Sequence, residues 1–306
     1  MTSRYPYSVV IALLAATMAN GPIVARDADP PSSFLTGRAF QYQVVAGDTI
    51  TLVSARYGIH PSEIIERNRL KPNAVFTPGQ ILELENLHIV PVVDDDVALV
   101  INVPQRMLFL DEGDRASGYP IAVGRRDWPT PLGDFNIVVK ETEPTWDVPE
   151  SIQEEMRREG RVVLEKVPPG PENPLGAFWL GLSLGSVGIH GTNAPSSIFR
   201  STTHGCIRMH PDDIAALFPR VVTGTRGRIV YSPVLLAKTA DGIFVEAHPD
   251  IYRRMAGDPL ALVRDIANAV GIANEIDWLQ VARALKARRG MAVPVASATS
   301  PRSSLN

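Results

Sequence analysis

The chain has 306 residues, of which 45% are hydrophobic and 21% are charged, and its formal net charge at pH 7 is −3. This length and apolar content suffice for two domains with sizeable cores. The weak net charge, without a run of lysines and arginines, argues against nucleic acid as the main partner. The 26 prolines and 23 glycines favour short strands and turns over a helical bundle.

The first 25 residues have the pattern of a secretory signal peptide. Arg4 supplies a positive charge, an apolar run covers residues 9–18, and residues 23–25 offer a cleavage site. The alternative is a transmembrane anchor, but this run is shorter than the roughly 20 residues that a bilayer requires. We therefore expect export, with no transmembrane segment after cleavage. Residues 26–38 are predicted to be a linker.

Residues 39–88 are predicted to form a small module with a strand at each end and two helices between. Thr49 is a good N-cap for the first helix, and Gly58 stands where a left-handed C-cap belongs. Pro61 opens the second helix, which runs towards Asn68. From the residues alone this is a small α+β module.

This module resembles a LysM domain, a small unit that binds glycans containing N-acetylglucosamine. The resemblance depends on residues 44–49, 55–58 and 77–82 together with Asn68, whereas Thr51 stands where the family often has a large residue. It implies a role in binding wall glycan strands. Each candidate contact can equally serve as a turn or cap residue of the module itself. The candidate glycan contacts are Gly47, Asp48, Thr49 and Asn68.

After an acidic, proline-containing boundary at residues 90–96, short strands separated by turns continue over residues 97–231. Strands this short and numerous predict a mostly β domain, either a sandwich or barrel-like. Residues 232–290 are predicted to be a partly helical C-terminal extension. The last stretch, 291–306, is rich in serine, proline and alanine and is predicted to be a disordered tail.

The only cysteine, Cys206, lies near two of the six histidines, His190 and His204. A single thiol near imidazoles is a candidate nucleophile. An idle thiol in an oxidising compartment is also a liability, because it is open to oxidation. The simpler alternative is a buried cysteine that only packs. A thiolate attacks carbonyls, so Cys206 requires a base or a lowered pKa.

His190 is the predicted base, because it comes from a separate strand and can approach the sulfur face on. His204 is too close in sequence, since across Gly205 its ring is poorly placed to point at Cys206. We expect His190 and Cys206 to form an ion pair, and a backbone carbonyl could fix the His190 tautomer. The backbone N–H groups of Gly205 and Cys206 could bind an oxyanion. The predicted reaction is acyl transfer through a thioester.

Two other chemistries use similar residues. His190, His204 and Cys206 could instead be zinc ligands, although their spacing is tight and neither a fourth ligand nor a separate base is apparent. A serine acyl-enzyme of the penicillin-binding class is disfavoured because no Ser-x-x-Lys sequence occurs. The sequence thus predicts neither a metal nor a cofactor.

The region around Cys206 is similar to the signature of L,D-transpeptidases of the YkuD type. Residues 130–135 and 173–176 also resemble recurrent stretches of that family, and the match covers about residues 97–231. A preceding LysM module is common among periplasmic members. The signature consists of His190-Gly191-Thr192-Asn193-x-Pro195-x-Ser197-Ile198 and Thr203-His204-Gly205-Cys206-Ile207-Arg208-Met209.

The resemblance implies that Cys206 is the nucleophile, that His190 is the base and that the Gly191 carbonyl orients the imidazole. It implies a supporting role for His204. The Gly205 and Cys206 amides are expected near the oxyanion.

Substrate binding is expected from three further positions of the motif. Arg208 could engage a substrate carboxylate, and a structural salt bridge is the alternative. Phe199 and Ser201 depart from the family, where glycine and proline are usual, and Thr203 replaces the commoner serine. These departures concern the choice of acceptor more than the chemistry. The substrate-binding candidates are Arg208, Asn193 and Thr203.

By this resemblance the donor is a peptidoglycan tetrapeptide stem, attacked at the carbonyl before its terminal D-alanine. The acceptor could be the amine of another stem, giving a 3–3 cross-link, a lysine of a wall-anchored lipoprotein, or water, as in an L,D-carboxypeptidase. The partners are then stem peptides and glycan strands, and the expected location is the periplasm. Two alternatives remain: a non-catalytic LysM wall-binding protein and a zinc amidase.

Overall fold

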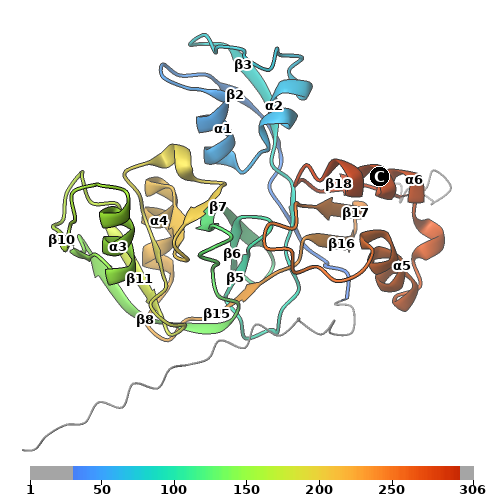
Figure 1. The fold of residues 1–306 in the computed structure, drawn as a ribbon. Coiled ribbons are helices and arrows are strands. Elements are labelled where there is room, and N and C mark those ends of the chain that lie inside the picture. The colour runs from blue at the N-terminus through green and yellow to red at the C-terminus, as the bar shows by residue number, and fades with distance from the viewer. Residues whose placement is uncertain (1–29, 297–306) are drawn as a thin grey trace, which may run out of the picture.

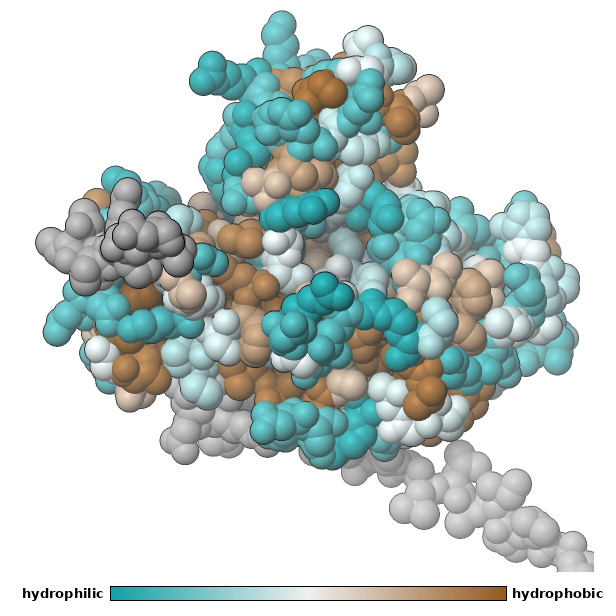
Figure 2. Space-filling view, turned by 180° about the vertical axis from the view of Figure 1, so that it is seen from behind, coloured by the Kyte–Doolittle hydropathy of each residue, from teal (hydrophilic) through white to brown (hydrophobic). Residues whose placement is uncertain are grey.

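The computed structural model describes residues 30–296. The predicted signal peptide and residues 297–306 lie outside these described residues. A small N-terminal module stands above a strand-rich central domain, and a C-terminal unit with two helices lies beside that domain (Figure 1). From behind, the N-terminal module forms a separate lobe (Figure 2). No helix within residues 30–296 has the length and apolar content to span a membrane.

The N-terminal module has the predicted order of strand, helix, helix and strand. Thr49 caps the first helix by accepting a hydrogen bond from the Leu52 N–H, and Gly58 ends it at φ 68°. Val53, Ile64 and Leu82 belong to its small core. The two strands pair antiparallel. The elements are β2 (Ala39–Gln43), α1 (Ile50–Tyr57), α2 (Pro61–Arg67) and β3 (Ile81–Glu85).

The central domain is a nine-stranded sheet that closes on itself, because β7 pairs with β6 as well as with β13 and β14. This agrees with the predicted barrel-like domain. The order around the sheet is β13-β7-β14-β12-β11-β8-β15-β5-β6. The strands are β5 (Leu99–Asn102), β6 (Met107–Asp111), β7 (Ala116–Gly124), β8 (Gly133–Thr142), β11 (Phe178–Leu182), β12 (Gly188–His190), β13 (Ser201–Thr203), β14 (Ile207–Met209) and β15 (Arg226–Val230).

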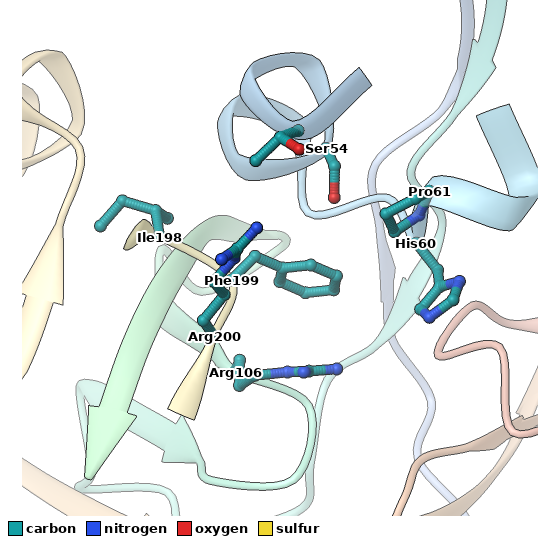
Figure 3. A pocket seen from close by; sticks show the side chains of 8 residues that line it. Ser54, His60, Pro61, Arg106, Ile198, Phe199 and Arg200 are labelled. Carbon is teal, nitrogen blue, oxygen red and sulfur yellow. The ribbon is translucent and has the colours of Figure 1, made fainter. Parts of the chain in front are cut away.

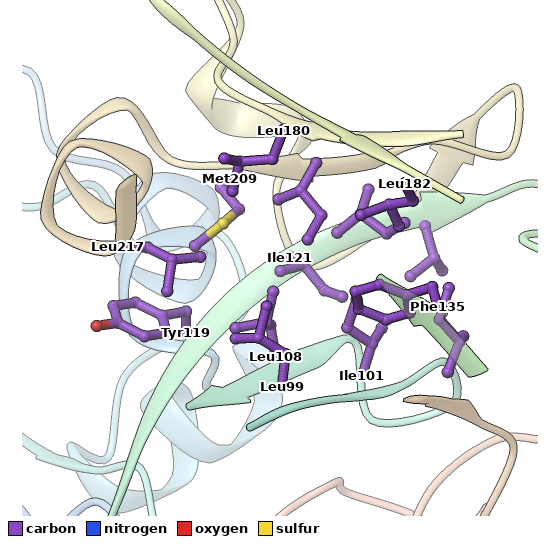
Figure 4. Packing of buried hydrophobic residues seen from close by; sticks show 14 of the residues in the cluster. Leu99, Ile101, Leu108, Tyr119, Ile121, Phe135, Leu180, Leu182, Met209 and Leu217 are labelled. Carbon is purple, nitrogen blue, oxygen red and sulfur yellow. The ribbon is translucent and has the colours of Figure 1, made fainter. Parts of the chain in front are cut away.

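Large apolar side chains fill the interior of this sheet. Leu108, Ile121 and Phe135 point toward one another between the strands (Figure 4). Their burial supplies the rigid frame on which the strand ends and loops of the site are built. Outside the frame lie β9 (Trp146–Asp147), α3 (Glu150–Arg158), β10 (Lys166–Val167), η1 (Pro195–Ser197), α4 (Pro211–Leu217) and η2 (Phe218–Arg220).

The C-terminal unit has its own apolar core, to which Val245, Val263 and Val281 belong. The prediction of a disordered tail from residue 291 was wrong for residues 291–296. β18 pairs with β17, and Val295 is fully buried. Composition misled here because Val295, which lies among small residues, packs into this core. The elements are β16 (Val234–Thr239), β17 (Gly242–Ala247), α5 (Pro259–Ala269), η3 (Ala273–Glu275), α6 (Trp278–Ala287) and β18 (Val293–Pro294).

The predicted linker is also partly built into the fold. Ser32 bridges to Ala237 of the C-terminal unit, and β1 (Leu35–Thr36) pairs with β4 (His88–Ile89). The N-terminal module is therefore held at both of its ends, by strands that lie next to each other.

The N-terminal module also contacts the central domain beside the predicted motif. The Arg56 guanidinium lies 2.6 Å from Asp213 Oδ1 of α4. Ala55 shares an apolar cluster with Ile198 and Phe199, which follow η1 in the motif. The module thus rests on the loop that continues from the predicted catalytic residues.

Candidate active site

Strand pairing brings the two halves of the motif together. β12 and β14 are parallel neighbours, with Ile189 opposite Ile207 and His190 opposite Arg208. Both isoleucines are fully buried in the interior of the sheet. Because side chains alternate along a strand, His190, Arg208 and the preceding Cys206 belong to the opposite face. A separate strand therefore delivers His190 to the face that carries Cys206.

The His190 ring is held by its own strand end. His190 Nδ1 lies 2.7 Å from the carbonyl oxygen of Gly191. A carbonyl only accepts, so Nδ1 carries the hydrogen and Nε2 of the neutral ring is left to accept a proton. Burial, aided by the nearby Arg208 charge, lowers the pKa of His190 to about 3. The imidazole is thus a neutral, oriented base.

Burial also raises the pKa of the Cys206 thiol, although a backbone hydrogen bond with Gly188 and the Arg208 charge oppose the shift. Both shifts disfavour the charged forms, because thiolate and imidazolium each lose solvent. The ion pair expected from the sequence is therefore disfavoured in this resting geometry. A neutral thiol and a neutral imidazole on one face of the sheet fit proton transfer during attack.

Trp179 is a residue of the site that the sequence analysis missed. It is the register partner of His190 in the β11–β12 pair. The two rings stack, with centroids 5.9 Å apart and planes inclined by 27°. The indole also covers Gly188, where an added Cβ would lie 2.3 Å from the ring. The signals were a glycine two residues before the histidine and an aromatic residue in the preceding strand.

The turn before Cys206 is supported by two threonines. Thr203, a predicted substrate contact, is only 3% exposed, and its hydroxyl donates to the Cys206 carbonyl at 2.6 Å. The same oxygen accepts from the Gly205 N–H at 3.2 Å. Thr130 donates to the Gly205 carbonyl at 2.9 Å. Thr203 therefore maintains the turn, and the Gly205 amide would have to share its hydrogen to bind an oxyanion.

His204 is tied to a different part of the domain. Its Nε2 lies 2.5 Å from Glu155 Oε2 of α3, and its ring meets Trp128 edge-on at 4.8 Å. Glu155 also accepts from Arg125 at 2.6 Å. This arrangement fits support of the catalytic turn and leaves His190 as the candidate base.

Arg208 faces the site without an acidic partner. Its Nη1 donates to Ser197 Oγ at 2.9 Å, and its Nε is buried without a partner among the described residues. Burial lowers the pKa of the Arg208 guanidinium, and the nearby Cys206 raises it by a smaller amount. Residues 30–296 therefore offer no carboxylate for the salt-bridge alternative. Asn193 is exposed, and its Nδ2 donates to the Glu172 carbonyl at 3.2 Å.

The candidate glycan contacts make bonds inside the N-terminal module. Asp48 accepts from the Val45 N–H at 2.8 Å, and Thr49 caps α1. Asn68 accepts from the Glu83 N–H at 2.7 Å and donates to the Glu83 carbonyl at 2.9 Å. Gly47 makes its turn at φ 92°. These hydrogen bonds favour a role for the side chains in stabilising the module. A glycan contact at these residues stays a prediction.

The zinc alternative requires ligands that converge. Within residues 30–296, no group of three or more His, Cys, Asp or Glu side chains is arranged to hold a metal ion. His204 is engaged with Glu155, and His190 with the Gly191 carbonyl.

Comparisons with known proteins agree with this geometry. Residues 96–234 match the L,D-transpeptidase catalytic domain, YkuD, and residues 42–84 match the LysM domain. A probable L,D-transpeptidase ErfK/SrfK of Escherichia coli is 32% identical over 286 residues, covering 88% of this chain and 89% of that protein. A putative L,D-transpeptidase YkuD of Bacillus subtilis is 31% identical over 185 residues, covering 60% of this chain and 95% of that protein.

Solved structures with similar folds are more distant. The catalytic domain of an Enterococcus faecium L,D-transpeptidase acylated by ertapenem has 19% identity and a TM-score of 0.35, covering 45% of this chain and all of that chain. An L,D-transpeptidase from Mycobacterium smegmatis has 16% identity and a TM-score of 0.37, covering 66% of this chain and 94% of that chain. These likenesses carry no argument on their own. The match to ErfK/SrfK extends over most of both chains, and it shows that this chain belongs to the L,D-transpeptidase family.

Proposed function

We propose that this protein is a peptidoglycan L,D-transpeptidase that works through a Cys206 thioester. The observation that carries the proposal is the pairing of β12 with β14. This pairing sets His190 and Cys206 on one face of the sheet, with His190 Nδ1 held 2.7 Å from the Gly191 carbonyl. A thiol next to an oriented neutral base is the arrangement that nucleophilic acyl transfer requires.

The reaction begins when the donor stem enters with its terminal carboxylate against Arg208, whose buried Nε has no partner in the described structure. Cys206 Sγ attacks the carbonyl before the terminal D-alanine while His190 Nε2 takes the thiol proton. The same proton then goes to the nitrogen of D-alanine, which leaves, and an acyl thioester remains. An acceptor amine attacks the thioester, returns its proton through His190 and releases the thiol.

The acceptor and the cellular setting follow from the domain pair. The LysM domain fits glycan strands of the wall, so the catalytic domain works where stems are abundant. Export by residues 1–25 to the periplasm agrees with this substrate. The acceptor is the amine of another stem or a lysine of a wall-anchored lipoprotein, and water as acceptor would make the enzyme an L,D-carboxypeptidase.

The test incubates the protein with purified muropeptides and reads the products by mass. Loss of D-alanine with formation of a dimer supports transpeptidation, and loss of D-alanine with only a shortened monomer supports the carboxypeptidase. Intact-protein mass spectrometry with ertapenem should show an adduct on the unaltered protein and none on Cys206→Ala. An adduct that persists on Cys206→Ala would refute the assigned nucleophile. Binding to sacculi without any turnover would instead support a non-catalytic wall-binding protein.

A further inference from the structure

A cavity lies where the LysM domain meets the catalytic domain, and no step of the proposed reaction uses it. Its volume is about 150 Å³. The LysM domain contributes Thr51, Ser54 and His60, and the catalytic domain contributes Arg106, Phe199 and Arg200 (Figure 3). Both domains are needed to form it.

The Arg106 guanidinium is the main charge of this cavity. Arg106 has φ 55° in the turn between β5 and β6, and its Nε is buried without a partner among the described residues. Burial lowers the pKa of Arg106 to about 10, and no carboxylate opposes that shift. Removing an ion from water costs several kcal/mol unless a counter-charge offsets it. The fold therefore holds a cation whose counter-ion the described residues do not supply.

Arg200 adds positive charge to the cavity, whereas the neutral form of His60 is favoured there. Burial first, and then the charge of Arg106, lower the pKa of His60. Arg200 is exposed and also lines the cavity. Glu63, the acid that raises the pKa of His60, already pairs with Arg289 at 2.8 Å. The cavity is thus suited to an anion.

Phe199 shapes the wall of the cavity. Its ring lies under the Arg106 guanidinium, with the carbon of the guanidinium 4.6 Å from the ring centroid. Its backbone has φ 61°, a left-handed conformation that is uncommon for a bulky residue. Ile121 holds it there by accepting from the Phe199 N–H at 3.0 Å. The Phe199 ring therefore forms an aromatic wall of the cavity beside the guanidinium.

Size and geometry narrow the class of ligand. An engineered cavity of about 150 Å³ accommodates a benzene molecule, so this one admits a small acid group with a short stem but not a sugar ring. A planar guanidinium matches the two oxygens of a carboxylate. We propose that this interdomain cavity binds a carboxylate group. On the proposed function, its source is a side carboxylate of a peptidoglycan stem whose glycan strand is held by the LysM domain.

The position of the cavity links it to catalysis. Ser197, which receives the hydrogen bond from Arg208, is two residues before Phe199. A carboxylate in the cavity would hold the loop between these residues against the LysM domain. Occupancy would therefore favour stems presented by a bound glycan strand over free peptides.

The first test uses acetate as the probe on the full mature chain and does not depend on turnover. Side-chain Nε–H signals of arginine and the Phe199 amide signal are followed by NMR during titration with sodium acetate, and again with sodium chloride at equal ionic strength. We expect a saturable shift of the Arg106 and Phe199 signals with acetate alone. No saturable shift, or the same shift with chloride, would overturn the proposal.

Two independent variants test the cavity, so that the result does not depend on either one alone folding well. Arg106→Gln removes the cation, and Thr51→Glu places a carboxylate at the cavity that competes with acetate. Both should abolish the acetate response, whereas the neutral control Thr51→Gln should retain it. A response that survives in Thr51→Glu would place the acetate elsewhere and refute the cavity.

A second measurement distinguishes a side carboxylate of a peptidoglycan stem from a free small anion as the ligand of the cavity. The KM for stems with free side carboxylates is compared with the KM for stems amidated there, with the terminal carboxylate left free for Arg208. We expect amidation to raise KM about 3- to 10-fold in the unaltered enzyme and to have no effect in Thr51→Glu. An unchanged KM together with a positive acetate titration would assign the cavity to a free small anion. If no stem reacts at all, the proposed function fails while the acetate titration still decides the cavity.

Discussion

The indole ring of Trp179 stacks on the imidazole of His190, with centroids 5.9 Å apart. His190 is also held by the Gly191 carbonyl through Nδ1. The imidazole is therefore fixed in tautomer and in plane, and it is shielded from water, with 4% of the His190 surface exposed. This shielding is what depresses its pKa.

The first prediction concerns the space that Gly188 leaves for Trp179. Gly188→Ala should displace the indole, because the added Cβ would lie 2.3 Å from the ring. We expect kcat to fall at least tenfold with a smaller change in KM, since the ring that positions His190 moves. In a Trp179→Ala background the same substitution should cost little, because contacting residues are not additive. Equal losses in both backgrounds would show that Gly188 acts independently of the indole.

The second prediction concerns the pH dependence of kcat/KM. In the proposed mechanism the reactive form has a neutral thiol and a neutral imidazole, and the pKa of His190 is lowered to about 3. Protonation of His190 should therefore not reduce the rate near pH 6.5, and kcat/KM should stay level down to about pH 5. Trp179→Ala should admit water and move the acid limb upward. An acid limb near pH 6.5 in the unaltered enzyme would instead indicate a solvated imidazole.

The third prediction concerns Thr130, which supports the catalytic turn from outside the motif. Its hydroxyl donates to the Gly205 carbonyl and accepts from the Gly124 N–H at 2.8 Å. Thr130→Val keeps the shape but leaves both buried groups unpaired, at a cost of about 1–3 kcal/mol each. We expect a lower melting temperature and a reduced kcat with little change in KM.

Two controls accompany Thr130→Val. Thr130→Ser keeps the hydroxyl and should recover most of kcat. Thr225→Val removes an exposed turn hydroxyl that accepts from the Val222 N–H, and it should leave kcat unchanged. A kcat that stays low in Thr130→Ser would mean that the methyl group, and not the hydrogen bonds, is what matters.

The fourth prediction concerns a buried ionisable cluster that joins the units of the fold. Glu246 is fully buried and lies 2.8 Å from both His88 Nδ1 and His248 Nε2, while Gln105 donates to it at 3.0 Å. Although burial opposes it, the two histidines hold the pKa of Glu246 below its usual range. Burial lowers the pKa of His248, so that histidine is neutral in the folded protein.

Both shifts make the folded protein sensitive to acid. The stability due to Glu246 is present above its unfolded pKa of about 4.5 and is lost as pH falls below it. The stability due to neutral His248 is lost as pH falls below about 6.5, where the unfolded chain takes up the proton. Thermal melts should show a decline from pH 7 to pH 5 and a steeper one below pH 4.5.

Glu246→Gln tests this cluster directly. The substitution removes a charged acceptor that His88, His248 and Gln105 share in a buried site, so we expect a large fall in melting temperature at pH 7 and a weaker dependence below pH 4.5. The control is Glu275→Gln, which breaks the exposed pair with Lys238 and should cost about 1 kcal/mol or less. Equal effects of the two variants would contradict a special role for the buried cluster.

Local sequence patterns determined much of this protein. The caps Thr49 and Gly58 and the N1 proline Pro61 set the ends of the LysM helices, because capping depends on neighbouring residues only. The motif was enough to predict Cys206 and His190 as the reacting pair, and its resemblance to the family implied the contact of His190 with the Gly191 carbonyl that the structure contains. These features depend on residues that are contiguous in the chain, so the sequence alone was sufficient to predict them.

Only the tertiary structure decided which distant residues complete the site. Trp179 reaches His190 through strand register, His204 turns to Glu155 on α3, and Arg106 meets Phe199 under the LysM domain. The same holds for Val295, whose burial converts a stretch of tail-like composition into part of the core. Each of these outcomes depends on pairing and desolvation between segments far apart in the chain. Neither composition nor periodicity encodes those pairings locally, and desolvation is also what disfavours the expected ion pair of His190 and Cys206.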